Sequence, residues 1–227
     1  MVTDAFAVFV SREILETLED ESAKLRDKLK QQLAKEDVSW DYEEITGEVL
    51  PRLVQRAALA DLVITGRQPQ KPEFGGPPIV FLGEMLRTIR TPLLVIGDEA
   101  TEIDPFGPAI VAWNGSYEAA NALRSAIPLL KISSKVRIVS VTEETEGQFP
   151  STSSLEYLSR HGIHAELIQR PWIVATVEEQ LIDQAAAHGA SYIVMGGYSH
   201  SRAGEFIFGG VTRSLLKKCP VSLVMTR

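Results

Sequence analysis

The segment Ala190-Ser-Tyr-Ile-Val-Met-Gly196 decides the fold, because a short apolar run that ends in glycine is typical of a buried strand. Its apolar residues are nearly continuous, as in strands that are covered on both faces of a parallel sheet. Just upstream, Val174 to His188 carries apolar residues at helical spacing, and Gly189 follows as a helix-ending residue. A helix that leads into a buried strand is a building block of α/β sheets.

Three more β-rich runs surround this unit, at residues 109–113, 135–141 and 220–225. Between the first two, residues 117–130 have the pattern of a helix that Pro128 kinks or ends. Strands that alternate with helices predict an α/β fold, with a parallel sheet and helices on both of its faces.

Part of this pattern also occurs in the first half of the chain. Ala60–Gly66 aligns with Ala190–Gly196 at an offset of 190 − 60 = 130, and Thr91–Ile96 aligns with Cys219–Val224 at 219 − 91 = 128. A repeat of this length indicates a duplicated domain rather than a solenoid. Prolines 105 and 108 lie in the turn-rich segment between the copies.

The two copies differ in length, since 87 residues separate Ala109 from Gly196 but only 65 precede Gly66. We therefore predict a partial domain at 1–98, a linker at 99–108 and a complete domain at 109–227, the first lacking its opening strand and helix. An N-terminally shortened form of a longer natural chain would explain the difference.

The remaining elements of the first copy follow from apolar spacing. We expect a long amphipathic helix over about 13–36, a strand near 39–45 and a helix over about 49–60, with residues 6–10 as the remnant of a lost strand.

Composition excludes several classes of protein. The 227 residues are 44% hydrophobic and 23% charged, with a net charge of −7, which is typical of a soluble globular chain and unfavourable for binding nucleic acid phosphates. No run is long enough to cross a membrane, and no basic segment marks a secretory signal. The single cysteine, Cys219, suits a reducing cytoplasm and is predicted to be an inert core thiol.

Two segments follow the carboxyl ends of predicted strands, where open parallel sheets bind ligands. In Asn114-Gly115-Ser116, Ser116 can cap the next helix and leave backbone N–H groups for an anion. The alternative is a tight strand-to-helix turn without a ligand.

The second segment runs from Gly196 to Arg202 and continues at Phe208-Gly-Gly-Val-Thr-Arg213. Glycines allow a backbone to approach a phosphate closely, and a helix start offers unpaired N–H donors. Ser199 and Thr212 add hydroxyls, and Arg202 and Arg213 add positive charge. Alternatively, the glycines serve only turns in a long connection.

Together these features resemble the universal stress protein family. Many members carry a motif of Gly, two residues, Gly, nine residues and Gly-Ser or Gly-Thr, which holds the phosphates of ATP. Here Gly196, Ser199, Gly209 and Gly210 occupy these positions, so the spacing matches but Ser199 replaces a glycine and Gly210 replaces the hydroxyl residue. The family's usual aspartate after the first strand is Asn114.

The resemblance implies a tandem protein of two Rossmann-like units of the adenine-nucleotide α-hydrolase type, each with a parallel sheet. It implies ATP or another adenine nucleotide in the second unit, with Mg²⁺ only alongside the nucleotide, and adenine against residues 139–141. Because proline removes N–H donors, no nucleotide is expected on the proline-rich loop 66–78 of the first unit. The implied nucleotide-binding residues are Asn114, Gly115, Ser116, Val141, Gly196, Gly197, Ser199, His200, Arg202, Gly209, Gly210, Val211 and Thr212.

The leading hypothesis is a non-enzymatic stress-response protein that senses an adenine nucleotide and is read by an unidentified protein partner. The alternatives are a nucleotide-independent dimeric scaffold, favoured by Ser199 and Gly210, and a slow ATPase for which no general base is evident. The strand edges at 92–96 and 220–225 are expected to pair within the chain, and the incomplete first domain favours a homodimer. His161 and His164 lack further ligands at metal-binding spacing, so no metal site is predicted.

Overall fold

The computed structural model describes residues 12–45, 48–67, 78–97, 103–141, 148–170, 175–197 and 209–227. The chain divides into two compact units, Met1–Val49 and Leu50–Arg227.

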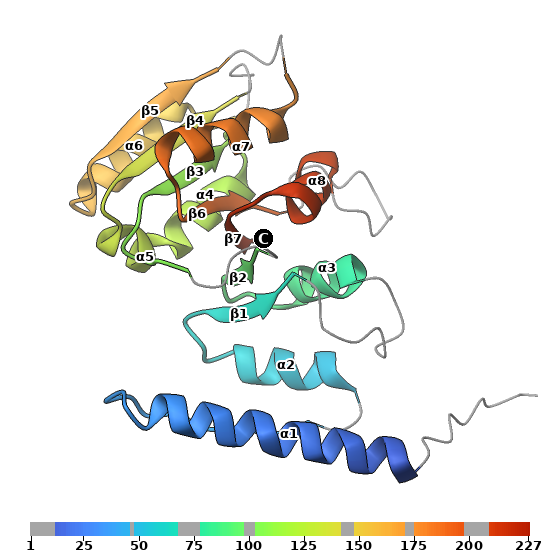
Figure 1. The fold of residues 1–227 in the computed structure, drawn as a ribbon. Helices are drawn as coiled ribbons and strands as arrows, with labels where there is room; N and C mark the ends of the chain where they lie inside the picture. Colours follow the sequence, from blue (N-terminus) through green and yellow to red (C-terminus); the bar gives the residue numbers. More distant parts are fainter. Residues whose placement is uncertain are drawn as a thin grey trace, which may run out of the picture. The chain divides into compact units, whose positions relative to one another are not determined.

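The second unit is built on one seven-stranded sheet with the strand order β1-β2-β7-β6-β3-β4-β5 (Figure 1). Every neighbouring pair is parallel except β2 and β7, which are antiparallel. The α/β class with a mostly parallel sheet is therefore confirmed, whereas the division at 99–108 into two domains stays a prediction. The strands are β1 (Val63–Gly66), β2 (Leu93–Ile96), β3 (Ala109–Trp113), β4 (Val136–Ser140), β5 (Ala165–Gln169), β6 (Tyr192–Gly196) and β7 (Ser222–Thr226).

The central strands are buried as their apolar sequences predicted. Every residue of β7 is buried, and in β6 only the terminal Gly196 is partly exposed. By contrast, β5 lies at the sheet edge with partly exposed and exposed residues, so its sequence, Ala-Glu-Leu-Ile-Gln, lacks the apolar run that marks the other strands.

Helices cover both faces of this sheet. One core cluster joins the sheet to α2 (Val49–Ala57), α3 (Pro78–Thr88), α7 (Val177–His188) and α8 (Gly210–Lys218). The other cluster joins the opposite face to α4 (Tyr117–Ser125), α5 (Ile127–Ile132) and α6 (Ser151–Arg160).

Local sequence signals set the helix ends. Thr176 and Glu179 form a reciprocal capping box at the start of α7, and Gly189 ends that helix with a left-handed φ of 62°. The helix predicted over 117–130 is two helices, with Pro128 in the first turn of α5, where a missing N–H costs no hydrogen bond.

The antiparallel seam between β2 and β7 joins the two sequence copies, as predicted from their strand edges. Leu94 of β2 lies opposite Val224 of β7, and both are buried in the core cluster of α4, α5 and α6. First-copy residues therefore complete the core of the second copy.

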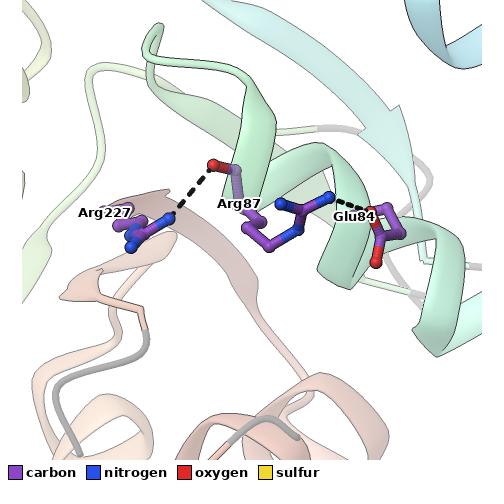
Figure 2. A network of polar contacts seen from close by, with 3 residues as sticks. All are labelled: Glu84, Arg87 and Arg227. Carbon is purple, nitrogen blue, oxygen red and sulfur yellow. Dashed lines mark hydrogen bonds and ion pairs between the residues drawn. The ribbon is translucent and has the colours of Figure 1, made fainter. Parts of the chain in front are cut away.

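An arginine hydrogen bond connects the two sequence copies at each end of the β2–β7 pairing. Arg67, which follows β1 and is 7% exposed, donates from Nη2 to the carbonyl oxygen of Val221 at 3.3 Å. At the other end, Figure 2 shows Arg227 Nη1 donating to the carbonyl oxygen of Arg87 at 3.3 Å, while the Arg87 guanidinium pairs with Glu84 at 2.7 Å. Each arginine ties one copy to the other through a main-chain carbonyl.

In the first unit, α1 (Arg12–Leu33) confirms the predicted long helix, but residues 38–45 are not a strand. The predicted strand at 39–45 is wrong, because no strand in the described part of the chain pairs with it and its side chains are largely exposed. The hydroxyls of Ser22 and Tyr42 instead lie 2.8 Å apart and connect this segment to α1. The predicted remnant strand at 6–10 lies outside the described residues.

No helix within the described ranges has the length and apolar character that a membrane span requires.

Replacing Leu94 with alanine tests the shared core. Leu94 is 3% exposed, so Leu94→Ala should lower the free energy of unfolding by about 2–5 kcal/mol. The control Leu59→Ala removes a side chain that is 98% exposed and should change stability by less than about 0.5 kcal/mol. Urea denaturation measures both, and equal effects would contradict a continuous sheet.

His188, the last residue of α7, predicts that the stability of the fold depends on pH. Burial, reinforced by the positive charge of Arg137, lowers the pKa of His188, and its Nε2 is buried without a hydrogen-bond partner. Since the folded pKa lies below the unfolded one, the unfolded state binds the proton first, and stability falls as the pH drops through about 6.5. His188→Gln should weaken the loss of stability between pH 7.5 and 5.5, measured by thermal melts beside the exposed-site control His164→Gln.

Candidate functional site

A cleft of about 170 Å3 lies at the carboxyl ends of the strands in the second copy. The described residues that line it are Ala112, Trp113, Asn114, Ala119, Val139, Val141, Val177, Leu181, Met195, Gly196, Gly209, Gly210, Val211 and Thr212.

Most of the wall is aliphatic. Val139 and Val141 come from the end of β4, Val177 and Leu181 from the first turns of α7, and Met195 from β6. Such a surface suits the flat face of an apolar or aromatic group.

The start of α8 forms the polar end of the cleft. Its N-cap, Gly209, has no side-chain hydrogen bond to the helix, and Arg213 N donates to Gly209 O at 3.0 Å. The N–H groups of Gly210, Val211 and Thr212 therefore precede the helical hydrogen-bond ladder. Together with the helix dipole, they favour an anion at this position.

Neither glycine at this helix start is required by packing within the described protein. A Cβ built on Gly209 or Gly210 has no described atom within 4 Å, and Gly209 has a φ of −53°, which other residues adopt easily. No described residue therefore fills the space beside either glycine.

Gly196, the last residue of β6, and Gly197, which follows it, have a different role from the glycines of α8. A Cβ on Gly196 would lie 2.5 Å from the carbonyl carbon of Glu118 and 2.6 Å from the nitrogen of Ala119, both in the first turn of α4. A Cβ on Gly197 would collide with the Leu86 side chain. These glycines allow close packing against helices.

The Asn114-Gly115-Ser116 segment is a tight turn. Ser116 N donates to Asn114 Oδ1 at 3.2 Å, and Ser116 Oγ accepts from Ala119 N at 3.1 Å, so Ser116 caps α4 as predicted. Gly115 has a φ of 70°, and its carbonyl oxygen accepts from Phe149 N at 2.9 Å. Of these three residues, Asn114 lines the cleft.

The structure thus brings together seven of the predicted residues: Asn114, Val141, Gly196, Gly209, Gly210, Val211 and Thr212. Gly115, Ser116 and Gly197 are not in its lining, whereas Ser199, His200 and Arg202 lie outside the described residues. The sequence analysis did not identify Trp113, Val177, Leu181 and Met195 as site residues. Val177 and Leu181 belong to the apolar face of a predicted helix, and this helix begins beside the same sheet edge.

The other side chains with reactive chemistry, His161 and Cys219, have contacts typical of structural residues. The His161 ring lies 4.7 Å from that of Tyr157 at the end of α6, and no cluster of three metal-ligating side chains occurs among the described residues. Cys219 is fully buried, and burial raises the pKa of its thiol, which disfavours the nucleophilic thiolate.

The part of the chain that matches a known family contains α7, β6, α8 and β7. Residues 172–227 match the universal stress protein family. This match includes the helix start and the glycines of the cleft's polar end. A search of curated proteins found no match.

Two solved structures share the fold over most of the chain. A universal stress protein from Archaeoglobus fulgidus is 15% identical with a TM-score of 0.70, covering 96% of this chain and 80% of its own. A provisionally named universal stress protein from Pseudomonas aeruginosa is 16% identical with a TM-score of 0.57, covering 90% and 77%. At these identities the similarity concerns the fold.

Two alanine substitutions separate the glycines by their roles. Gly115→Ala combines a left-handed backbone with a Cβ 2.7 Å from the carbonyl oxygen of Phe149, and should cost about 2 kcal/mol or more. Gly209→Ala enters open space and should cost less than about 0.5 kcal/mol. Thermal unfolding compares them, and similar losses would show that Gly209 is also required for packing.

Proposed function

We propose that this protein is a universal stress protein-like nucleotide sensor, which binds ATP or another adenine nucleotide in the cleft and is not an enzyme. The observation that carries the proposal is the start of α8, where the N-cap is a glycine without a capping side chain and neither Gly209 nor Gly210 is required by a described neighbour.

The phosphates are the part of the ligand that fits this helix start. Three backbone N–H groups, at residues 210–212, are available there, and each hydrogen bond to a charged group contributes about 1.5–3 kcal/mol. Thr212 is 6% exposed and lines the same end, so its hydroxyl compensates for the glycine at position 210.

The base fits the aliphatic part of the cleft. Val139 and Val141 line it from the β4 side, as the resemblance implies for adenine, and Val177 and Leu181 line it from α7. The flat apolar faces of adenine match such walls better than a sugar alone would.

The described lining contains no carboxylate and no histidine. We therefore expect Mg²⁺ to enter only with the nucleotide, and we expect no general base for hydrolysis. A signal would arise when the bound nucleotide changes a surface that a protein partner reads in the cytoplasm.

A homodimer is the assembly that we propose. Strand β1 is an edge of the sheet, and its residue Ile64 is 62% exposed. Unpaired edges and exposed apolar side chains favour association with a second copy. Light scattering of Ile64→Lys, which should be monomeric, tests this part separately.

Replacing Gly210 with valine tests the nucleotide site. The added Cβ meets no described atom within 4 Å, so the fold should persist, whereas phosphates at the α8 start would collide with the valine side chain. We expect at least a tenfold loss of ATP affinity by calorimetry, with an unchanged melting temperature. Thr152→Val, at an exposed position in the first turn of α6, is the matched control.

The purified wild-type protein should also release an adenine nucleotide on denaturation. Absence of any such nucleotide, together with no heat of binding at millimolar ATP, ADP and AMP, would reject the sensor and favour the scaffold. Turnover that disappears in Gly210→Val would instead reject the non-enzymatic assignment.

A further inference from the structure

A second cavity of about 330 Å3 lies between α4 and α6, and of its lining residues only Trp113 also lines the cleft. Its described lining residues are Trp113, Tyr117, Ala120, Asn121, Leu123, Arg124, Phe149, Ser153, Ser154 and Tyr157.

Four of its ten described lining residues are aromatic, and two of these four are exposed. Tyr117 is 74% exposed and Phe149 is 39% exposed. Their rings meet edge to face, with centroids 5.1 Å apart and an interplanar angle of 86°. Exposed apolar surface that gathers around a cavity commonly marks a binding site.

Backbone contacts hold these rings in place without a ligand. Phe149 N donates to the carbonyl oxygen of Gly115 at 2.9 Å, and the indole Nε1 of Trp113 donates to the carbonyl oxygen of Phe149 at 3.3 Å. Because the indole N–H is already bonded, Trp113 offers the cavity its ring. A preformed aromatic wall loses little conformational entropy when it binds a flat ligand.

One side of the cavity is positively charged. Arg124 is the single ionised residue in the described lining, and no described carboxylate lies within salt-bridge distance of it. Its Nη2 donates to Asn121 Oδ1 at 3.0 Å, while Asn121 Nδ2 donates to the main-chain oxygen of Arg227, the last residue of the sequence, at 3.4 Å. The guanidinium is thus oriented by a neutral amide and retains donors for a carboxylate.

From this arrangement we propose a second ligand site, which binds a planar aromatic carboxylate between α4 and α6. The aromatic ring of the ligand packs against Tyr117, Phe149 and Tyr157, and its carboxylate pairs with Arg124. The proposal is independent of nucleotide binding, because it uses neither the start of α8 nor the aliphatic wall of the cleft.

The probe is indole-3-carboxylate, with the uncharged isostere indole-3-carboxamide as the matched ligand. Saturation-transfer NMR on the full chain detects contact, and a titration followed by ligand-observed relaxation gives the affinity. We expect the carboxamide to bind at least tenfold more weakly, because it cannot form the ion pair with Arg124.

Two exposed-site variants test the wall and the charge without disturbing the core. Tyr117→Ser and Arg124→Gln should each weaken binding of indole-3-carboxylate about five- to tenfold with unchanged melting temperatures. Arg160→Gln, which removes an exposed arginine at the end of α6 outside the cavity, should leave the affinity unchanged.

Three outcomes would overturn the proposal. They are no saturation transfer at millimolar probe, equal affinity for the carboxylate and the carboxamide, and binding that survives Tyr117→Ser and Arg124→Gln. A repeat in Gly210→Val separates the two sites, since indole-3-carboxylate should bind this variant as it binds the wild type. Loss of probe binding there would place the probe in the cleft and also reject the second site.

Discussion

The antiparallel hydrogen bonding of β2 to β7 is the constraint on which the described sheet depends. Strands β1 and β2 alone would form a two-stranded sheet, which is marginal in water. Joined to β7, they extend a seven-stranded sheet, and the buried Leu94 and Val224 pack in one core cluster. The seam also removes the edge that β7 would otherwise expose. Strands β1 and β2 are therefore stable as part of this seven-stranded sheet.

The seam also determines the surroundings of the cleft. With β2 on one side and β6 on the other, β7 is buried throughout, and α8 leads directly into it. Gly196 lies opposite Thr226 in the β6–β7 pair, and the next residue, Gly197, donates to the carbonyl oxygen of Thr226 at 2.9 Å. The end of β6 is thus fixed by the strand that carries the seam.

Sequence patterns predicted the features that depend on local chemistry and repetition. The family resemblance and the tendency of strand edges to pair predicted the pairing of β2 with β7, and apolar runs predicted the buried strands. They failed where tertiary context decides. The segment 39–45 has strand-like residues, but no described strand lies beside it. By contrast, β5 forms a strand because it pairs with β4, Val136–Ser140. Similarly, no spacing rule shows that Phe149 donates to Gly115, although that contact shapes both the turn and the second cavity.

The glycines show most clearly why a motif alone does not define a site. In the sequence, Gly115, Gly196, Gly209 and Gly210 are equivalent candidates for contact with phosphate. In the structure, Gly115 is required by a left-handed backbone and Gly196 by the close approach of α4, so both would be needed in a protein that binds nothing. Gly209 and Gly210 have neither requirement among their described neighbours. A glycine costs conformational entropy on folding, and the nucleotide that we propose would use this pair at a helix start by approaching its backbone.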